Sequence, residues 1–328
     1  MKKRVLGDNG PQVSAIGLGC MAMSEFYGSA DDENSKKVIL EALERGVTFL
    51  DTADTYGHGH NERLIADALE SWGKEVFIAT KFGIVREPGE YKRRICGKPA
   101  YVKTAVEESL KRLNVEAIDL YYAHRIDKDV PIEETVGAMS DLVKAGKIKY
   151  IGLSEPSVET VLKAHAVHPI TCIQSEYSLF TREVETSLLP VLRENGIGFV
   201  PYSPLGRGIL TGKLTKASMA DAGDFRKHLP RTSDEYFDEN MTLVSGLKEI
   251  ADARGITLAQ LALAWVLAKG DDIVPIPGTR NIKYLIENIE SADLALDADT
   301  VNRIETIAHP DAVRGERYTE EGMRGLNG

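Results

Sequence analysis

The chain has 328 residues, of which 43% are apolar and 27% charged, so it can bury a sizeable core as one large barrel or two ordinary domains. Its net charge is −10, which argues against a broad nucleic-acid-binding face. No apolar run approaches the roughly 20 residues that cross a bilayer, and residues 7–11 interrupt the basic start too early for a signal peptide. Cys20, Cys96 and Cys172 have no metal-binding or redox spacing, so we expect reduced thiols in a cytoplasmic protein.

The first predicted element is a β-hairpin over residues 4–16, because Asp8-Asn9-Gly10 suits a tight turn. Short, nearly continuous apolar segments then predict eight strands, at 16–20, 47–52, 76–81, 118–124, 150–154, 172–177, 198–203 and 273–276. Apolar residues at helical spacing predict helices between these strands and after the last one, at 31–45, 62–72, 100–113, 131–145, 158–168, 184–195, 240–269, 282–291 and 298–307.

Eight strands alternating with helices, at roughly 25 to 45 residues per unit, predict an α/β protein with a (β/α)8 TIM barrel. Apolar strands of this kind suit a parallel sheet that is buried on both faces. The hairpin would close the bottom of the barrel, and the last helix would be an extra C-terminal one. Because no Pro/Gly/Ser-rich linker divides the chain, we expect one domain over residues 1–328. Three connections exceed the usual length and suggest functional loops: 82–99, 205–239 and 309–328.

Polar side chains stand where three successive predicted strands end. Asp51 ends the second strand and Tyr56 follows it, Lys81 ends the third, and His124 ends the fourth. Each residue alone has an ordinary structural explanation, such as a turn cap or a solvated strand end. Adjacent parallel strands lie about 4.8 Å apart, however, so these ends would bring all four side chains within reach of one another.

This set suits proton donation by tyrosine. A free phenol has a pKa of about 10, and a nearby ammonium lowers it. We therefore expect Asp51 to keep Lys81 charged, and Lys81 to lower the pKa of Tyr56. Neutral His124 could donate a hydrogen bond to a substrate oxygen. A carbonyl held in this way is ready to accept hydride, and since the four residues contain no hydride source, a nicotinamide cofactor is implied.

The stretch Asp-Thr-Ala-x-x-Tyr-Gly, with Lys81 and His124, resembles the aldo-keto reductase family over essentially the whole chain. His124-Arg125-x-Asp127 and Gly152-Leu153-Ser154-Glu155 look like its bacterial and plant subgroup, which acts on varied aldehydes, pyridoxal included. The resemblance implies the (β/α)8 barrel and an NADPH-dependent reductase that converts aldehydes or ketones to alcohols with Tyr56 as general acid.

The resemblance also implies the residues that bind NADPH across the C-terminal face. Ser154 and Gln174 would bind the carboxamide, and Tyr202 would stack on the nicotinamide. The pyrophosphate would be lined by Ser203, Leu205, Gly206 and Gly208, with Lys213 reaching it. The segment from Gly278 and Thr279 into the next helix would hold the 2′-phosphate through Arg280 and Lys283, with Glu287 and Asn288 at the adenine. A helix N-terminus independently suits a phosphate.

Two motifs point elsewhere. Gly17-x-Gly19-x-x-Ala22 matches a dinucleotide fingerprint, but residues 24–29 intervene before helical pattern begins, whereas a true fingerprint opens a helix at once. His58 and His60 resemble metal ligands, yet they lie in a predicted loop without a third ligand, so we predict no metal.

Two alternative functions stay open. A non-catalytic NADPH-binding redox sensor, like the channel β subunits that share this fold, could retain all four site residues. A metal-dependent barrel hydrolase would instead show activity that chelators abolish and that needs no nicotinamide.

The expected partner is a small-molecule carbonyl substrate, and neither nucleic acid nor a membrane is expected. The sequence does not indicate the oligomeric state. The substrate depends on the long loops, whose bases and aromatics would admit an acidic or aromatic aldehyde: Tyr91, Lys92, Arg93, Arg94, Phe225, Tyr236 and Tyr318.

Overall fold

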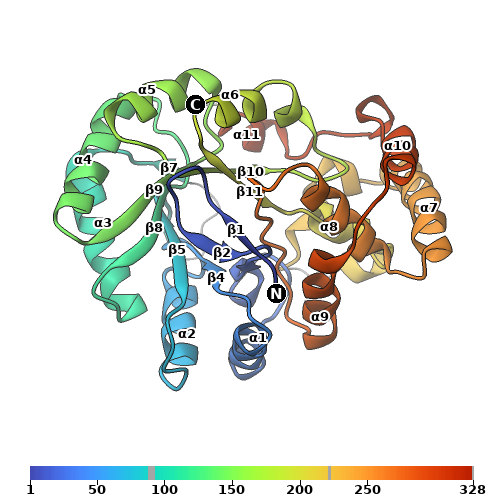
Figure 1. Ribbon diagram of the computed structural model, residues 1–328, viewed down its shortest axis with the longest axis horizontal. Helices are drawn as coiled ribbons and strands as arrows, with labels where there is room; N and C mark the ends of the chain where they lie inside the picture. Colours follow the sequence, from blue (N-terminus) through green and yellow to red (C-terminus); the bar gives the residue numbers. More distant parts are fainter. Residues whose placement is uncertain (88–92, 221–222, 327–328) are drawn as a thin grey trace.

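A barrel of parallel strands ringed by helices forms the protein (Figure 1). The computed structural model describes residues 1–87, 93–220 and 223–326, so Tyr91 and Lys92 lie outside the described residues. Seven strands form the main sheet, in which spatial order follows chain order. They are β3 (Leu18–Gly19), β4 (Phe49–Asp51), β5 (Phe77–Phe82), β8 (Ile118–Ala123), β9 (Ile148–Ser154), β10 (Cys172–Glu176) and β11 (Gly198–Tyr202).

The predicted eighth strand closes the ring between β11 and β3, although its pairing is irregular. Val274 and Ile276 donate their N–H groups to carbonyls of β11. Pro275 and Pro277 face the other way and accept hydrogen bonds from N–H groups of the stretch that contains β3. Since proline has no N–H, this segment cannot return those bonds, and a regular ladder does not form. The predicted TIM barrel is confirmed, with one strand weakened by its prolines.

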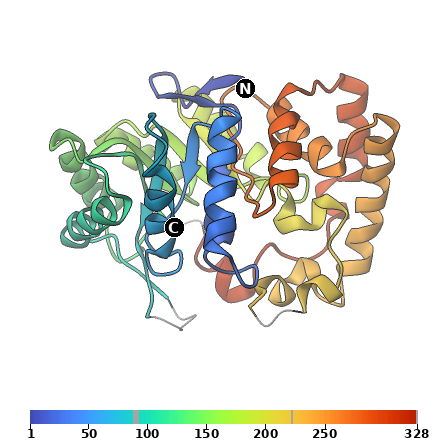
Figure 2. The same ribbon diagram turned by 90° about the horizontal axis from the view of Figure 1, so that it is seen from below.

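The predicted hairpin is present as β1 (Lys3–Val5) and β2 (Gln12–Ser14), which pair antiparallel. Asp8 N–H donates to the carbonyl of Gly196, which precedes β11, at 2.9 Å. Gly7 has a φ of +71°, and a Cβ there would lie 2.6 Å from that same carbonyl oxygen, so only glycine fits the approach. The hairpin therefore covers the N-terminal ends of the strands, at the end of the barrel away from the long loops (Figure 2).

Most predicted helices are found within a few residues of their expected ends: α1 (Asp32–Glu44), α2 (His60–Leu69), α3 (Pro99–Leu113), α4 (Ile132–Lys144), α5 (Val158–Val167), α6 (Leu188–Glu194), α9 (Ile282–Glu290) and α10 (Ala298–Ile307). The predicted 184–195 helix starts instead as a short 3-10 turn, and only its second half is α-helical. The extra C-terminal helix is α10.

The helix predicted over 240–269 was wrong as a single element. Two helices occupy the stretch, α7 (Phe237–Ala253) and α8 (Leu258–Ala268), and they meet at 89°. Gly255 has a φ of +66°, which ends α7, and Thr257 forms a capping box with Gln260 that starts α8. Among the described helices none is by itself long and apolar enough to cross a membrane; only this bent pair, taken together, reaches that length and apolarity.

The three long connections contain short elements that the sequence reading did not anticipate. Residues 82–99 contain the antiparallel strands β6 (Ile84–Val85) and β7 (Arg94–Ile95). The 205–239 stretch contains the 3-10 helices η3 (Gly206–Thr211), η4 (Ala217–Met219), η5 (Phe225–His228) and η6 (Pro230–Thr232). The tail contains η8 (Pro310–Ala312) and α11 (Glu320–Met323). Figure 2 shows the 205–239 stretch at the end of the molecule opposite the hairpin.

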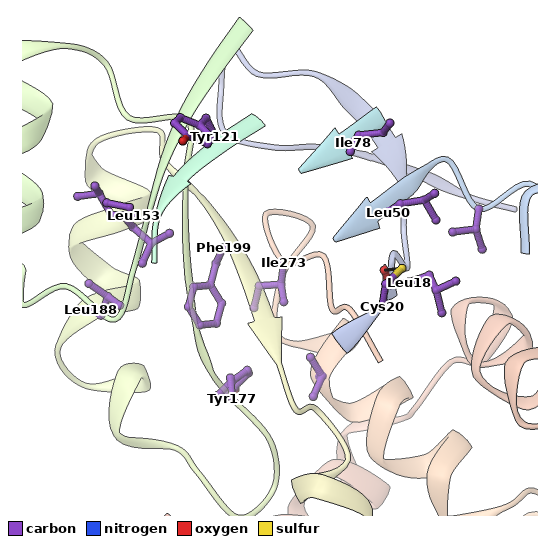
Figure 3. Packing of buried hydrophobic residues seen from close by; sticks show 14 of the residues in the cluster. Leu18, Cys20, Leu50, Ile78, Tyr121, Leu153, Tyr177, Leu188, Phe199 and Ile273 are labelled. Atoms are coloured by element: carbon purple, nitrogen blue, oxygen red, sulfur yellow. Dashed lines mark hydrogen bonds between the residues drawn. The ribbon is translucent and has the colours of Figure 1, made fainter. Parts of the chain in front are cut away.

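Alternate residues of each strand enter two different apolar layers, as a pleated strand requires. Leu50 and Ile78 pack in the layer between strands and helices, part of which Figure 3 shows. Their neighbours Phe49 and Ala79 pack inside the barrel. Every second residue of a strand faces the barrel interior, and the last of these inward-facing positions lie at the mouth of the barrel, at the C-terminal strand ends. The polar residues at these positions are Asp51, Lys81, His124, Ser154, Gln174 and Tyr202.

The barrel interior at Gly152 has no room for a side chain, because a Cβ there would lie 2.4 Å from the ring of Tyr122. Tyr122 is fully buried and cannot move aside cheaply. Gly152→Ala should therefore destabilise the fold by about 1–3 kcal/mol in chemical denaturation. The control is Gly137→Ala in α4, where a Cβ meets nothing within 4 Å, and this variant should gain up to about 1 kcal/mol. Equal effects of the two variants would contradict the packing argument.

Candidate active site

A cavity of about 1120 Å³ lies at the C-terminal ends of the strands, where the inward-facing polar residues gather. Its wall includes Asp51, Tyr56 and His124. Lys81 lies beneath that wall and is fully buried. The structure thus brings together the four residues that were predicted from the strand ends. Three of them line the cavity, and Lys81 does not.

The ion pair between Asp51 and Lys81 lies at the centre of the site. Lys81 Nζ donates to Asp51 Oδ1 at 2.5 Å and to the carbonyl of Thr52 at 2.6 Å, and it lies 3.5 Å from the hydroxyl of Tyr56. The other carboxylate oxygen of Asp51 accepts from Gln174 Nε2 at 2.8 Å. Every polar atom of the pair thus has a partner, as buried charges require. The pair fixes Lys81 within reach of the phenol.

The turn after β4 holds Tyr56 in place. The hydroxyl of Thr52 donates a hydrogen bond to Asn61 Oδ1 at 2.6 Å. The Nδ2 group of Asn61 in turn donates to the carbonyl of Cys20 at 2.9 Å. Gly57 has a φ of +56°, so the chain turns sharply just after the tyrosine. The ring of Tyr56 meets that of His124 edge to face, with centroids 5.7 Å apart. The tyrosine is only 8% exposed, so its hydroxyl works in a largely dry site.

The backbone of His124 is fixed by a hydrogen bond, and its ring stays available. The backbone N–H of His124 donates to the carbonyl of Phe82 at 2.8 Å. Its Nδ1 is buried without a hydrogen-bond partner among the described residues. Burial, followed by the charges of Lys81 and Arg125, lowers the pKa of His124 well below its usual value. The ring is therefore neutral and can donate one hydrogen bond.

The charges around Tyr56 differ from the expectation. Burial first, and then the carboxylate of Asp51, raise the pKa of Tyr56 well above its usual value, while Arg125 acts to lower it. Burial and Asp51 together outweigh the lowering by the cations near the ring. The net direction is thus opposite to the lowered pKa that the sequence suggested. Tyr56 therefore keeps its proton near neutral pH.

Most residues expected to bind the cofactor line the cavity, which includes both the strand ends and the start of α9. Gly206 and Lys283 do not line it, and the residues that do are Ser154, Gln174, Tyr202, Ser203, Leu205, Gly208, Lys213, Gly278, Thr279, Arg280, Glu287 and Asn288. Lys213 Nζ lies 4.3 Å from the centre of the Tyr284 ring, so the chain just after η3 approaches α9 beside the cavity.

Arg280 is more engaged than the sequence suggested. Its guanidinium donates to the carbonyls of Tyr27, at 2.7 Å, and of Ser29. The Asn281 side chain accepts from the N–H of Lys283 at 2.9 Å and so takes up one free donor at the start of α9. Arg280 therefore ties the loop after β3 to the eighth strand, and its place at the cavity also leaves it near any phosphate bound there.

The sequence reading did not single out a network formed by the tail. Arg317 donates to both carboxylate oxygens of Glu155, at 2.9 and 2.8 Å, and Tyr202 donates to the same carboxylate at 2.8 Å. The hydroxyls of Tyr318 and Tyr202 lie 3.0 Å apart. No local signal could have found these contacts, since about 160 residues separate Arg317 from Glu155.

A family model and known proteins match this chain over most of its length. The family model described as Aldo/keto reductase family matches residues 15–309. The chain belongs to the aldo-keto reductase family. The probable aldo-keto reductase 1 of Glycine max is 46% identical over 315 residues, which cover 95% of this chain and 90% of that protein. Membership implies NAD(P)H-dependent carbonyl reduction of small molecules.

Solved structures of the family share the fold. The glycerol dehydrogenase AKR11B4 of Gluconobacter oxydans superposes with a TM-score of 0.85 at 28% identity, over 94% of this chain and 96% of that one. The aldo-keto reductase AKR11C1 of Bacillus halodurans, in its holo form, gives 0.79 at 30% identity, over 94% and 97%.

The cavity of this aldo-keto reductase suits a dinucleotide chemically. Ser154 and Gln174 line it at the strand ends, and the cations Lys213 and Arg280 line it near the N-terminus of α9. Gly208 also lines it, with a φ of +100°, and the missing side chain lets the backbone lie close to a ligand.

One of the two histidines that resembled metal ligands has other partners. His60 pairs with the hydroxyl of Ser24 at 2.8 Å and with Asp32 at 3.0 Å. Within residues 1–87, 93–220 and 223–326, no group of three His, Cys, Asp or Glu side chains could hold a metal ion.

The burial of His124 predicts its titration. In an NMR titration, its imidazole should stay neutral at pH 6, where an ordinary histidine is roughly three-quarters protonated. Since the folded pKa lies below the unfolded one, the folded state binds fewer protons at low pH. Stability should therefore fall as pH drops through about 6.5. His124→Gln identifies the resonance and should flatten this fall; a His124 signal that titrates near pH 6.5 would contradict the burial argument.

Proposed function

We propose that the protein is an NADPH-dependent reductase that converts aldehydes, and also ketones, to alcohols. The observation that supports this most is the contact between buried Lys81 and the Tyr56 hydroxyl, beside neutral His124, on one cavity that runs to α9. A bound nicotinamide would supply hydride to the carbonyl carbon. Free buried thiols at Cys20, Cys96 and Cys172 support a cytoplasmic location.

The chain's own residues orient the carbonyl and supply the proton. Tyr56 and His124 would donate hydrogen bonds to the carbonyl oxygen from two sides, which polarises it and favours charge on the oxygen in the transition state. Tyr56 would then pass its proton to that oxygen. The phenolate so formed lies 3.5 Å from the Lys81 ammonium, which stabilises it, while Asp51 keeps the lysine charged.

The assigned cofactor positions divide the cavity. Ser154 and Gln174 would bind the carboxamide, and Tyr202 would pack on the nicotinamide ring. Gly206 and Gly208 would allow the pyrophosphate to approach the backbone, together with Ser203, Leu205 and Lys213. Preference for NADPH would come from Gly278, Thr279, Arg280 and Lys283 around the 2′-phosphate, with Glu287 and Asn288 at the adenine.

Tyr56→Phe should lower the turnover of an aldehyde such as 4-nitrobenzaldehyde by about 10²–10⁴-fold, because the proton donor is lost. NADPH binding, followed by fluorescence titration, should stay nearly unchanged. Tyr101→Phe is the control, since Tyr101 is a partly buried tyrosine of α3 that does not line the cavity. Unchanged turnover in Tyr56→Phe would refute the mechanism, and wild-type protein that binds NADPH without oxidising it would favour the redox-sensor alternative.

Arg280→Ala should raise the Kd for NADPH by about 10-fold or more and that for NADH much less, because a hydrogen bond to a charged phosphate is lost. The Kd values of both cofactors come from fluorescence titration of the same preparation. If both cofactors weaken equally, Arg280 acts only by holding the loop of Tyr27 and Ser29, and the placement of the 2′-phosphate is wrong.

A further inference from the structure

Arg125 is a buried arginine that the proposed chemistry does not use. It follows His124 at the end of β8, is only 7% exposed and lines the cavity. Its Nη1 donates to the carbonyl of His124 at 2.6 Å and to the hydroxyl of Ser154 at 3.1 Å. Its Nε is buried and has no hydrogen-bond partner among the described residues. A donor left in this state costs free energy unless a ligand takes it up.

The charge of Arg125 is also left without a counterion. The carboxylate whose charge reaches it, Glu155, is already held by Arg317 through two hydrogen bonds and by Tyr202 through a third. No ion pair joins Arg125 to an acid in the described parts of the chain. The guanidinium is therefore buried without an ion-pair partner of its own, and the site favours an incoming anion.

Three other arginines of the cavity differ from Arg125 in this respect. Arg86 pairs with Glu25, Arg207 with Glu176 and Arg226 with Asp224. Arg280 and Lys213 also line the cavity without an acid partner among the described residues, but they lie near α9. Arg93 resembles Arg125: it lies exposed at the mouth beside β7 and pairs with no acid that the structure describes. The strand-end part of the cavity therefore keeps the unpaired charges of Arg125 and Arg93, although the whole chain carries a net charge of −10.

These two charges lie at the reacting end of the cavity. Arg125 is next to His124 and bonds to Ser154, and the charges of both Arg125 and Arg93 act on the His124 ring. The phosphate-binding positions start from Ser203 and run toward α9, which is away from the strand end that carries Arg125. An anion drawn to Arg125 would therefore belong to the carbonyl substrate.

We propose that Arg125, helped by Arg93 at the rim, binds an anionic group of the substrate, so that the preferred substrates are aldehydes that carry a carboxylate. This rests on the proposed function and adds its substrate class. A carboxylate would take up the free Nε donor and neutralise the guanidinium, and the same contact would orient the aldehyde toward Tyr56 and His124.

The test compares each acid with its neutral ester. Succinic semialdehyde and 4-carboxybenzaldehyde are measured against their methyl esters with NADPH. Wild-type kcat/KM should favour at least one acid by about 10- to 100-fold, the range of a hydrogen bond to a charged group. Arg125→Gln should lose that preference through KM while it keeps most turnover of the ester, and Arg125→Lys should restore part of it. Arg93→Gln should lose less.

The matched control is Arg94→Gln, because Arg94 is an exposed neighbour on β7 that does not line the cavity, and its preference for the acid should be unchanged. Binding of 4-(hydroxymethyl)benzoate to the NADPH complex, measured by calorimetry, should weaken in Arg125→Gln but not in Arg94→Gln.

The outcomes separate the two claims. Equal turnover of acids and esters by wild-type protein, or equal loss of both in Arg125→Gln, would overturn the anion site and leave the reductase intact. Absence of NADPH oxidation with every aldehyde and ester would overturn the proposed function instead. In that case the calorimetric comparison still decides whether Arg125 binds the anion.

Discussion

The buried ion pair of Asp51 and Lys81 is the interaction on which the site depends. Two charges inside the barrel mouth are tolerable only because each is paired and further hydrogen-bonded, by Thr52 and Gln174. Removing either partner would leave an isolated charge in a dry interior. The pair also fixes the ammonium beside Tyr56, so the strands that meet at this point serve the packing of the barrel and the proposed proton transfer at once.

The same principle separates the paired from the unpaired charges of the cavity. Glu155 and Arg317 neutralise each other, and the contact ties the tail to the end of β9. Arg125 has no such partner, although it is almost as deeply buried. Where a protein satisfies nearly all its buried charges, an unsatisfied one beside the reacting groups indicates ligand binding more strongly than the composition of a surface loop does.

Much of the fold could be predicted because strand and helix patterns are local. The hairpin and most helix ends follow from turn residues, caps and apolar spacing. The 240–269 stretch was misread because its apolar pattern continues across Gly255, where only the αL backbone shows that the chain turns. The β6–β7 hairpin was missed for a related reason: it is short and lies in a polar connection, so it has little apolar pattern to show.

The sequence by itself determined the barrel, its family and the four residues of the proposed chemistry, because strand ends of a parallel barrel always meet at one face. Tertiary structure decided the electrostatics. Burial raises the pKa of Tyr56, Arg280 bonds to a loop far away in sequence, and the tail reaches Glu155. Spacing along the chain cannot show which charges are paired, since pairing depends on distances between segments that only folding brings together.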